Sequence, residues 1–331
     1  MPSKVHKSLD DAPRMKKRDA IETRTTSHSY TPYLPFGSLV YTAWVLMHRF
    51  SGINSKKFST IQLYGCGDIR APNLFGLRSQ HTVHSYFGKT LSTEEVLHRH
   101  SLFGYYSLGL NENDKTEWRN RLTKERSLRG HFSKTLRIPK TEKLNSNLKW
   151  CIDCANCDQL KIGFGTWRVL HQLPFISTCP IHQTQLCAVC ADCQSPLDNG
   201  TKFMLPGENC STCGSSQFTK LARIQNAAYI SLIKQVEDVF QTQPKKFRPV
   251  AWNALMRTYA LSFGSPRDAR ETLSRLICTR WEVESEDQIS DLLSYPLGRG
   301  YIQSLLSGHA ANTPLAAQLV VLDAMHSAFA T

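Results

Sequence analysis

Four short motifs between residues 151 and 213 decide how the middle of this chain folds: Cys151-Ile152-Asp153-Cys154, Cys179-Pro180-Ile181-His182, Cys190-x2-Cys193 and Cys210-x2-Cys213. Nine of the eleven cysteines of the chain lie in this window. Pairs of ligands separated by two residues, repeated after a short interval, are typical of tetrahedral zinc sites. The spacing therefore predicts two closed sites of four ligands each. Such sites stabilise a fold and leave no open position for a substrate.

Two extra cysteines keep the choice of ligands open. Cys157 could replace Cys154, and Cys187 could replace Cys190, because each extends a run of cysteines that are three residues apart. The same spacing resembles the start of a ferredoxin-type iron–sulfur motif, but in neither run does a cysteine follow at the fourth place. We therefore expect zinc, at two ions per chain.

The first residues of the chain, MPSKVHKSLDDAPRMKKRD, lack the apolar core of a signal peptide. No run of about 18 apolar residues is present that could span a membrane. We therefore expect a cytoplasmic protein without a membrane partner, in which thiols stay reduced and disulfides do not form.

The chain is strongly basic, with 40 Lys and Arg residues against 27 Asp and Glu residues and a formal net charge of +13. Such a charge suits a phosphate-bearing partner or an acidic protein surface. More than half of the surplus lies between Asn113 and Lys149, where eleven basic residues accompany four acidic ones. A solvated basic helix followed by a loop is the alternative interpretation of this stretch. The candidates for contact with nucleic acid or a partner are Arg119, Arg121, Lys124, Arg126, Arg129, Lys134 and Arg137.

Apolar residues recur at helical spacing before the cysteine-rich window. Residues 39–50 predict a helix with a buried face and with Ser38 as its N-cap. Ser92-Thr93-Glu94-Glu95 is a capping box that opens a short helix. Asn113-Asp114 opens a further helix that carries Trp118. Several short helices joined by brief turns are compatible with a helix-turn-helix arrangement.

The part after the window is predicted to be helical as well. Tyr229, Ile233, Val236, Val239 and Phe240 form one apolar stripe. Ser265-Pro266 and Thr313-Pro314 each place an N-cap before a proline at the first helical position.

The sequence therefore predicts a mainly α-helical protein. Its expected parts are a disordered basic arm (1–31), an N-terminal helical domain of helix-turn-helix type (32–148), two zinc-binding modules (149–219) and a C-terminal helical domain (220–331).

Enzyme motifs are incomplete. Phe87-Gly88-Lys89-Thr90 ends like a phosphate-binding loop, but Val83 stands where its first glycine must be. The sequence contains no His-Glu-x-x-His motif and no His-x-Glu before a Pro-Cys-x-x-Cys motif, so protease and deaminase chemistry lack their general acid or base. We expect no catalytic residue and no enzyme activity.

The order of these motifs resembles the TniQ family of transposition target selectors. The resemblance runs over roughly residues 32–220 and includes the segment 92–106. Its most specific part is Trp167-Arg168-Val169-Leu170-His171-Gln172-Leu173-Pro174, which lies a few residues before Cys179-Pro180-Ile181-His182. Pro35-Phe36-Gly37-Ser38-Leu39 looks like the opening motif of the family, although family members more often carry an acidic residue before that serine.

The resemblance implies an N-terminal helix-turn-helix region, paired zinc modules, a variable helical C-terminal part and no cutting of DNA. It also implies two zinc sites with separate ligand sets. The first set would be Cys151, Cys154, Cys179 and His182, and the second would be Cys190, Cys193, Cys210 and Cys213.

Family members choose where a transposon inserts. Short members link a crRNA-guided CRISPR effector complex to the AAA+ ATPase regulator that precedes the transposase, often as a homodimer. Longer members bind a fixed attachment site in DNA directly. A C-terminal part of about 110 residues is short for a direct reader, so we expect the adaptor role, with DNA as a further partner, in the bacterial cytoplasm and at the nucleoid. A zinc-stabilised transcription regulator unrelated to transposition is a third hypothesis.

Overall fold

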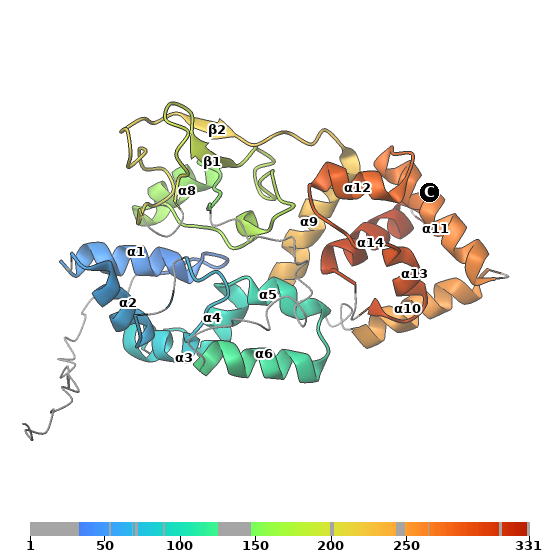
Figure 1. The fold of residues 1–331 in the computed structure, drawn as a ribbon, viewed down its shortest axis with the longest axis horizontal. Helices are drawn as coiled ribbons and strands as arrows, with labels where there is room; N and C mark the ends of the chain where they lie inside the picture. Colours follow the sequence, from blue (N-terminus) through green and yellow to red (C-terminus); the bar gives the residue numbers. More distant parts are fainter. Residues whose placement is uncertain are drawn as a thin grey trace, which may run out of the picture. The chain divides into compact units, whose positions relative to one another are not determined.

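Short helices make up most of the described chain. In the sequence they come before and after a cysteine-rich middle part that has little regular structure. The computed structural model describes residues 33–52, 54–67, 69, 72–88, 90–124, 147–198, 202–242, 249–263, 265–310 and 313–329. Over these residues the protein is mainly helical, as the sequence predicts, and the described sheet has two antiparallel strands (Figure 1). None of the described helices is long and apolar enough to cross a lipid bilayer.

The elements fall into three groups along the chain. Before the cysteine-rich window lie α1 (Val40–Phe50), α2 (Lys56–Tyr64), α3 (Ser79–Thr82), the π-helix η1 (Val83–Phe87), α4 (Thr93–Arg99), α5 (Phe103–Tyr106), the 3-10 helix η2 (Ser107–Gly109) and α6 (Glu112–Lys124). The window contains α8 (Ile152–Ile162), the 3-10 helix η3 (Leu170–Gln172), β1 (Cys187–Cys190) and β2 (Phe218–Lys220). After it follow α9 (Ala227–Thr242), α10 (Pro249–Leu261), α11 (Pro266–Trp281), α12 (Glu286–Leu293), α13 (Tyr301–Leu306) and α14 (Leu315–Phe329).

Helix α1 is buried over most of its length, but its start differs from the prediction. Its N-cap is Leu39, and Ser38 instead pairs in an antiparallel bridge with Arg168. Because α1 begins at Val40, the N-cap position belongs to Leu39, and Ser38 lies one residue too early to cap the first free N–H groups. The prediction of Ser38 as the N-cap is therefore wrong. Phe50, predicted on the buried face, is 68% exposed because it ends the helix beyond the core.

The capping box of α4 is confirmed. The backbone N–H of Glu95 donates to Ser92 Oγ at 3.2 Å, and the backbone N–H of Ser92 donates to Glu95 Oε2 at 2.9 Å. Helix α6 carries a buried Trp118 as predicted, but it begins at Glu112. The side chain of Asn111 caps its first turn by accepting from the N–H of Asp114 at 2.9 Å. Asparagine one residue before a helix satisfies a free N–H of the first turn, which explains the earlier start.

The apolar stripe predicted in α9 and the helix start predicted at Ser265-Pro266 are confirmed, whereas α14 begins at Leu315, one residue after the proline that the sequence predicts at its first position. All five residues of the stripe in α9 are buried. Ser265 caps α11 by accepting from the N–H of Asp268 at 3.1 Å, and Pro266 occupies the first turn. Fixed φ and the missing N–H make proline favourable at that position.

A buried carboxylate joins three of the C-terminal helices. Asp323 of α14 is only 3% exposed. It accepts from Arg280 Nε of α11 at 2.8 Å and from Gln235 Nε2 of α9 at 2.9 Å, and Ser231 of α9 also donates to it. Because each partner comes from a neighbouring helix, this network fixes how α9, α11 and α14 pack against each other.

Buried residues from all three predicted parts belong to one hydrophobic cluster. The segment Pro32–Thr331 forms one compact unit. Two buried contacts cross the expected boundaries: Tyr41 of α1 donates to Asp198 Oδ2 at 2.7 Å, and Tyr229 of α9 accepts from the N–H of Ser177 at 2.8 Å. The boundaries at 148 and 219, and the helix-turn-helix character of the first part, stay predictions.

Replacement of Asp323 by alanine is expected to lower the free energy of unfolding by about 3 to 5 kcal/mol, because it leaves a partly buried guanidinium without its partner. Urea unfolding followed by circular dichroism at fixed metal concentration measures the change. The control is Glu271→Ala, which removes the exposed pair with Arg267 of the same helix and is expected to change little. Equal effects of the two variants would contradict the role given to Asp323.

Candidate metal centres

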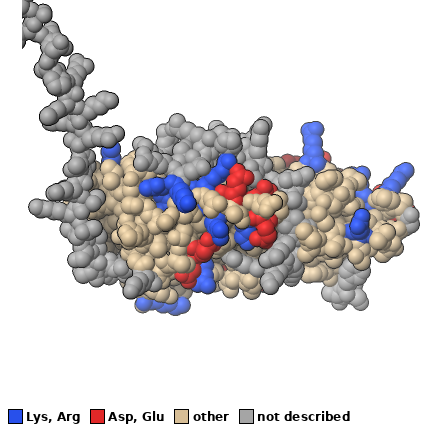
Figure 2. All heavy atoms as spheres, turned by 90° about the horizontal axis from the view of Figure 1, so that it is seen from below, with Lys and Arg blue, Asp and Glu red and all other residues tan. Residues whose placement is uncertain are grey.

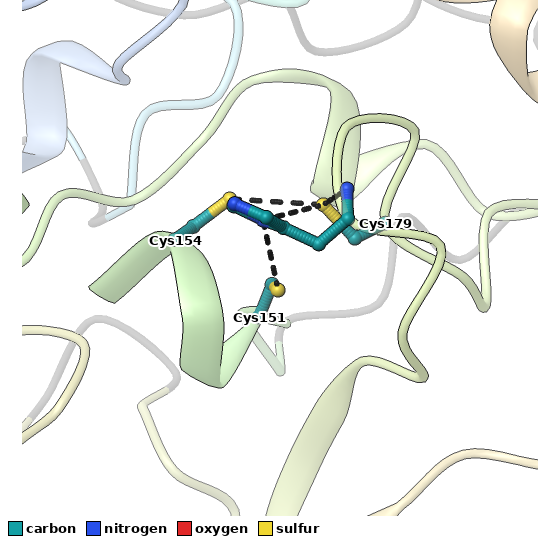
Figure 3. A group of neighbouring side chains, drawn as sticks. Cys151, Cys154 and Cys179 are labelled. Atoms are coloured by element: carbon teal, nitrogen blue, oxygen red, sulfur yellow. Dashed lines mark hydrogen bonds between the residues drawn. The ribbon is translucent and has the colours of Figure 1, made fainter. Parts of the chain in front are cut away.

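The first centre lies where the start of α8 meets the turn at residues 179–182. Cys151 is the N-cap of α8 and Cys154 lies in its first turn. Figure 3 shows both side chains directed towards Cys179, which comes from the facing turn. His182 lies in the same turn as Cys179, and its backbone N–H approaches Cys179 Sγ at 3.5 Å.

The distances within the first centre match a tetrahedral ion. His182 Nδ1 lies 3.6 Å from Cys151 Sγ, 3.3 Å from Cys154 Sγ and 3.7 Å from Cys179 Sγ. The sulfurs of Cys154 and Cys179 are 3.6 Å apart. With metal–ligand bonds of zinc length, a tetrahedron has sulfur–sulfur edges of about 3.8 Å and sulfur–nitrogen edges of about 3.6 Å. Three sulfurs and one nitrogen are therefore already spaced for a zinc ion.

The second centre gathers Cys190, Cys193, Cys210 and Cys213. The Sγ atoms of Cys190 and Cys213 are 3.6 Å apart, and so are those of Cys193 and Cys210. These are again the edges of a tetrahedron of four thiolates around zinc. The structure thus brings together both predicted sets of four residues, in the predicted groups.

The same backbone turn presents three of the four ligand pairs. In each turn the N–H of the first cysteine donates to the carbonyl five residues later, and the N–H four residues later donates back to the cysteine carbonyl. The residue after the second ligand has a positive φ in every case, at Gln183, Gln194 and Gly214. Such a turn points the backbone N–H groups and both ligand side chains towards one place. The fourth pair, Cys151 and Cys154, is presented by a helix start instead.

At least one thiol in each centre has a lowered pKa. A hydrogen bond from Cys154, followed by one from Cys179, holds the pKa of the Cys151 thiol far below its usual value, against the effect of burial. In the second centre the hydroxyl and then the backbone N–H of Ser195 lower the pKa of Cys193 to about 6. Since a metal ligand must be the thiolate, each group holds a sulfur that is ready to bind a cation.

The two extra cysteines lie outside both groups of four. Cys187 is buried in β1, where its backbone exchanges two hydrogen bonds with Trp150. Burial raises the pKa of its thiol to about 11. Cys157 is half-buried on α8, and its Sγ lies 4.0 Å from His182 Nε2. The arrangement therefore favours the ligand sets without these two cysteines.

The segment before the first centre is fixed by Gln172 of η3. The N–H of Lys149 donates to Gln172 Oε1 at 2.9 Å, and Gln172 Nε2 donates to the carbonyl of Lys149 at 2.8 Å. Lys149 Nζ in turn donates to the carbonyls of Leu173 and Ile176, each at 2.7 Å. Hydrogen bonds therefore hold both the backbone and the side chain of Lys149, two residues before Cys151.

Lys149 does not belong to a basic surface, although the sequence places it at the end of the basic stretch. Its side chain is buried, and burial lowers its pKa to about 7. Nothing in the local sequence signals this burial, because the groups that bind Lys149 lie 23 to 27 residues later in the chain.

The seven candidate residues for contact with nucleic acid or a partner have different outcomes. Arg119 pairs with Glu94 at 3.4 Å and Arg121 pairs with Glu117 at 2.6 Å. Lys124 is exposed at the end of α6. Figure 2, which views the molecule from below, shows acidic and basic side chains interleaved over the middle of that face. The remaining four, Arg126, Arg129, Lys134 and Arg137, lie outside the described residues.

We expect Gln172→Leu to lower the free energy of unfolding by about 2 kcal/mol, because it leaves the buried N–H and carbonyl of Lys149 without partners. Thermal and urea unfolding at fixed metal concentration measure the loss. Gln159→Leu is the matched control, since the amide of Gln159 is exposed and bonds only its own helix end at Gly163. A loss no larger than that of the control would show that Gln172 does not hold the segment.

Comparison with known proteins identifies a family domain in this chain. No curated protein matches the chain. The model of the TniQ family matches residues 47–186, a segment that contains all four residues of the first centre and ends before the second centre begins. The segment is narrower than the region over which the sequence motifs resemble the family. The match confirms the family that those motifs predict: residues 47–186 are a TniQ domain, which marks this chain as a transposition-associated target-selection protein.

Proposed function

We propose that this protein is a non-catalytic adaptor for transposition that links an RNA-guided CRISPR effector complex to the AAA+ ATPase regulator and, through it, to the transposase. The TniQ domain over residues 47–186 is the observation that carries the proposal. TniQ proteins work in transposition complexes with other transposon proteins, and the adaptor role assigns this chain two protein partners. DNA and a second copy of the chain are further expected partners.

In this proposal the two centres each hold a zinc ion with a structural role. A set of three thiolates and one imidazole and a set of four thiolates are the ligand types that zinc takes in closed sites. The ion would supply charge that keeps all ligand thiols deprotonated, together with folding free energy on the order of 10 kcal/mol in isolated zinc modules. The protein side chains would orient the ligands and exclude water. No catalytic step is assigned to any residue.

The distribution of charge supports the adaptor over a direct reader of DNA. Two of the three described candidates, Arg119 and Arg121, already pair with acidic side chains. A surface that tracks a phosphate backbone presents lysines and arginines without acidic neighbours, because each acidic group repels the phosphates. Interleaved charges suit a protein partner, whose own surface carries both signs.

A direct reader of a fixed attachment site is the second candidate function. The net charge of +13 and the sequence stretch that holds Arg126, Arg129, Lys134 and Arg137 favour it. These residues would supply contacts to phosphates, and sequence would have to be read by other side chains in a groove.

The zinc proposal is tested by Cys193→Ser. This variant is expected to bind one ion per chain where the unmodified protein binds two, and to melt at a lower temperature, because a serine hydroxyl is a poor zinc ligand. Inductively coupled plasma mass spectrometry and circular dichroism measure the two effects. Cys278→Ser on α11 changes a cysteine outside both centres and should keep two ions. A Cys193→Ser protein with two ions would show that the ligand set is wrong.

The choice between adaptor and direct reader is tested by binding of the zinc-loaded chain to random DNA and to candidate attachment DNA over a salt series. For an adaptor we expect weak binding that does not distinguish the two DNAs and falls steeply with salt. Neutralising Arg126, Arg129, Lys134 and Arg137 together should then flatten the salt dependence by about 0.9 in the logarithmic slope for each phosphate that the chain no longer neutralises.

Two results would contradict the adaptor role, one from the salt series and one from a separate binding experiment. A preference for attachment DNA at physiological salt would favour the direct reader. Failure of the chain to bind a purified crRNA-guided effector complex of the same transposon, with the zinc content verified, would remove the proposed partner. Arg119→Gln with Arg121→Gln is the matched control for the charge variant, because these two arginines are already paired.

A further inference from the structure

Polar side chains are arranged around the ligands of the first centre. His182 directs Nδ1 at the three sulfurs, at 3.3 to 3.7 Å. A neutral imidazole that binds a metal through Nδ1 carries its proton on Nε2. Metal-bound histidines almost always donate that second N–H to an acceptor, which fixes the orientation of the ring.

Cys157 is the group that faces the second nitrogen of His182. Its Sγ lies 4.0 Å from Nε2, one turn along α8 from Cys154. Cys157 lies outside the group of four whose ligand atoms converge on one point. Its position is that of an acceptor behind the histidine, on the side of the ring opposite to the metal.

Thr184 takes the corresponding position behind Cys151. Its hydroxyl oxygen lies 3.2 Å from Cys151 Sγ and 2.9 Å from Asp153 Oδ2. The carboxylate oxygen itself is 4.0 Å from the same sulfur. The Thr184 hydroxyl has a single proton, which it donates to Asp153 Oδ2 in this structure. A metal-bound thiolate can accept but not donate, so when Cys151 is a thiolate the hydroxyl has to turn this proton towards the sulfur for the contact to be a hydrogen bond.

We propose that Thr184 and Cys157 form an outer shell that positions the ligands of the first metal centre. Thr184 donates its hydroxyl proton to the Cys151 thiolate once the metal is bound, and Cys157 accepts from Nε2–H of His182. The inference rests on the proposed zinc site. It gives a role to the extra cysteine of the Cys151-x2-Cys154-x2-Cys157 run, which is that of a positioning residue and not of a ligand.

The test measures how tightly each of the two centres holds zinc in Thr184→Val and in Cys157→Ala, by competition with a chromogenic chelator. We expect both variants to bind two ions with zinc in excess, and to release the ion of the first centre 10- to 100-fold more readily, which is the usual effect of removing an outer-shell partner. The second centre in the same chain is the internal reference and should be unchanged. Thr184→Ser and Cys157→Ser keep a hydroxyl at each place and are expected to restore most of the affinity.

A spectroscopic measurement separates positioning from a general loss of stability. In the cadmium-substituted protein each centre gives its own cadmium-113 resonance, because three sulfurs with one nitrogen differ from four sulfurs. Thr184→Val should move only the resonance of the first centre. Thr212→Val is the matched control, since the hydroxyl of Thr212 contacts Lys202 Nζ at 3.0 Å and not a ligand sulfur.

Three other outcomes are possible, and each would contradict a different part of the proposal. If both variants hold zinc in the first centre as tightly as the unmodified chain, the outer shell is wrong while the zinc site stands. If Cys157→Ala binds one ion even with zinc in excess, Cys157 is itself a ligand and the inference fails. If the unmodified chain binds no zinc, the proposed metal sites fail, and the outer shell fails with them.

Discussion

Eight side chains drawn into two groups of four hold together a part of the protein that has little regular backbone structure. Between the end of α8 and the start of α9 the described chain forms only one short 3-10 helix and two short strands. Hydrogen bonds of secondary structure cannot fix so many irregular residues, and conformational entropy opposes their order. Convergence of the ligands supplies the constraint. Within each group of four, contacts join cysteines or histidine from segments that are 17 to 31 residues apart in the sequence.

The middle of the chain is also the place where the two helical parts are attached. Trp167 links the first helical part to this middle: its backbone N–H donates to Thr42 Oγ1 of α1 at 3.0 Å, and its indole Nε1 donates to the carbonyl of Met204, within the middle, at 2.9 Å. Tyr229 of α9 accepts from the N–H of Ser177 on the other side. A change in either metal centre would therefore reach α1 and α9 through a few buried hydrogen bonds.

The buried charged groups that the structure describes have structural partners: Asp323 joins three helices, and Lys149 binds two carbonyls beside the first centre. The thiols with shifted pKa values in the two centres belong to sets of four ligands. A site whose four ligands all come from the protein leaves no position for a reacting group.

The sequence by itself determined the helical class, the eight residues of the two groups, the family and several helix ends, because each of these is encoded locally. Ligand spacing of two residues, the capping box at Ser92 and the serine before Pro266 act within one turn of chain. The tertiary structure decided what depends on distant neighbours. Ser38 lies one residue before the N-cap of α1 and pairs with Arg168, and Lys149 became buried because Gln172, 23 residues later, binds it. The fold also places the sulfurs of Cys157 and Cys187 outside the two groups of four. The spacing of three residues is the same for these two cysteines as for their neighbours, so the sequence could not tell which sulfurs belong to a group.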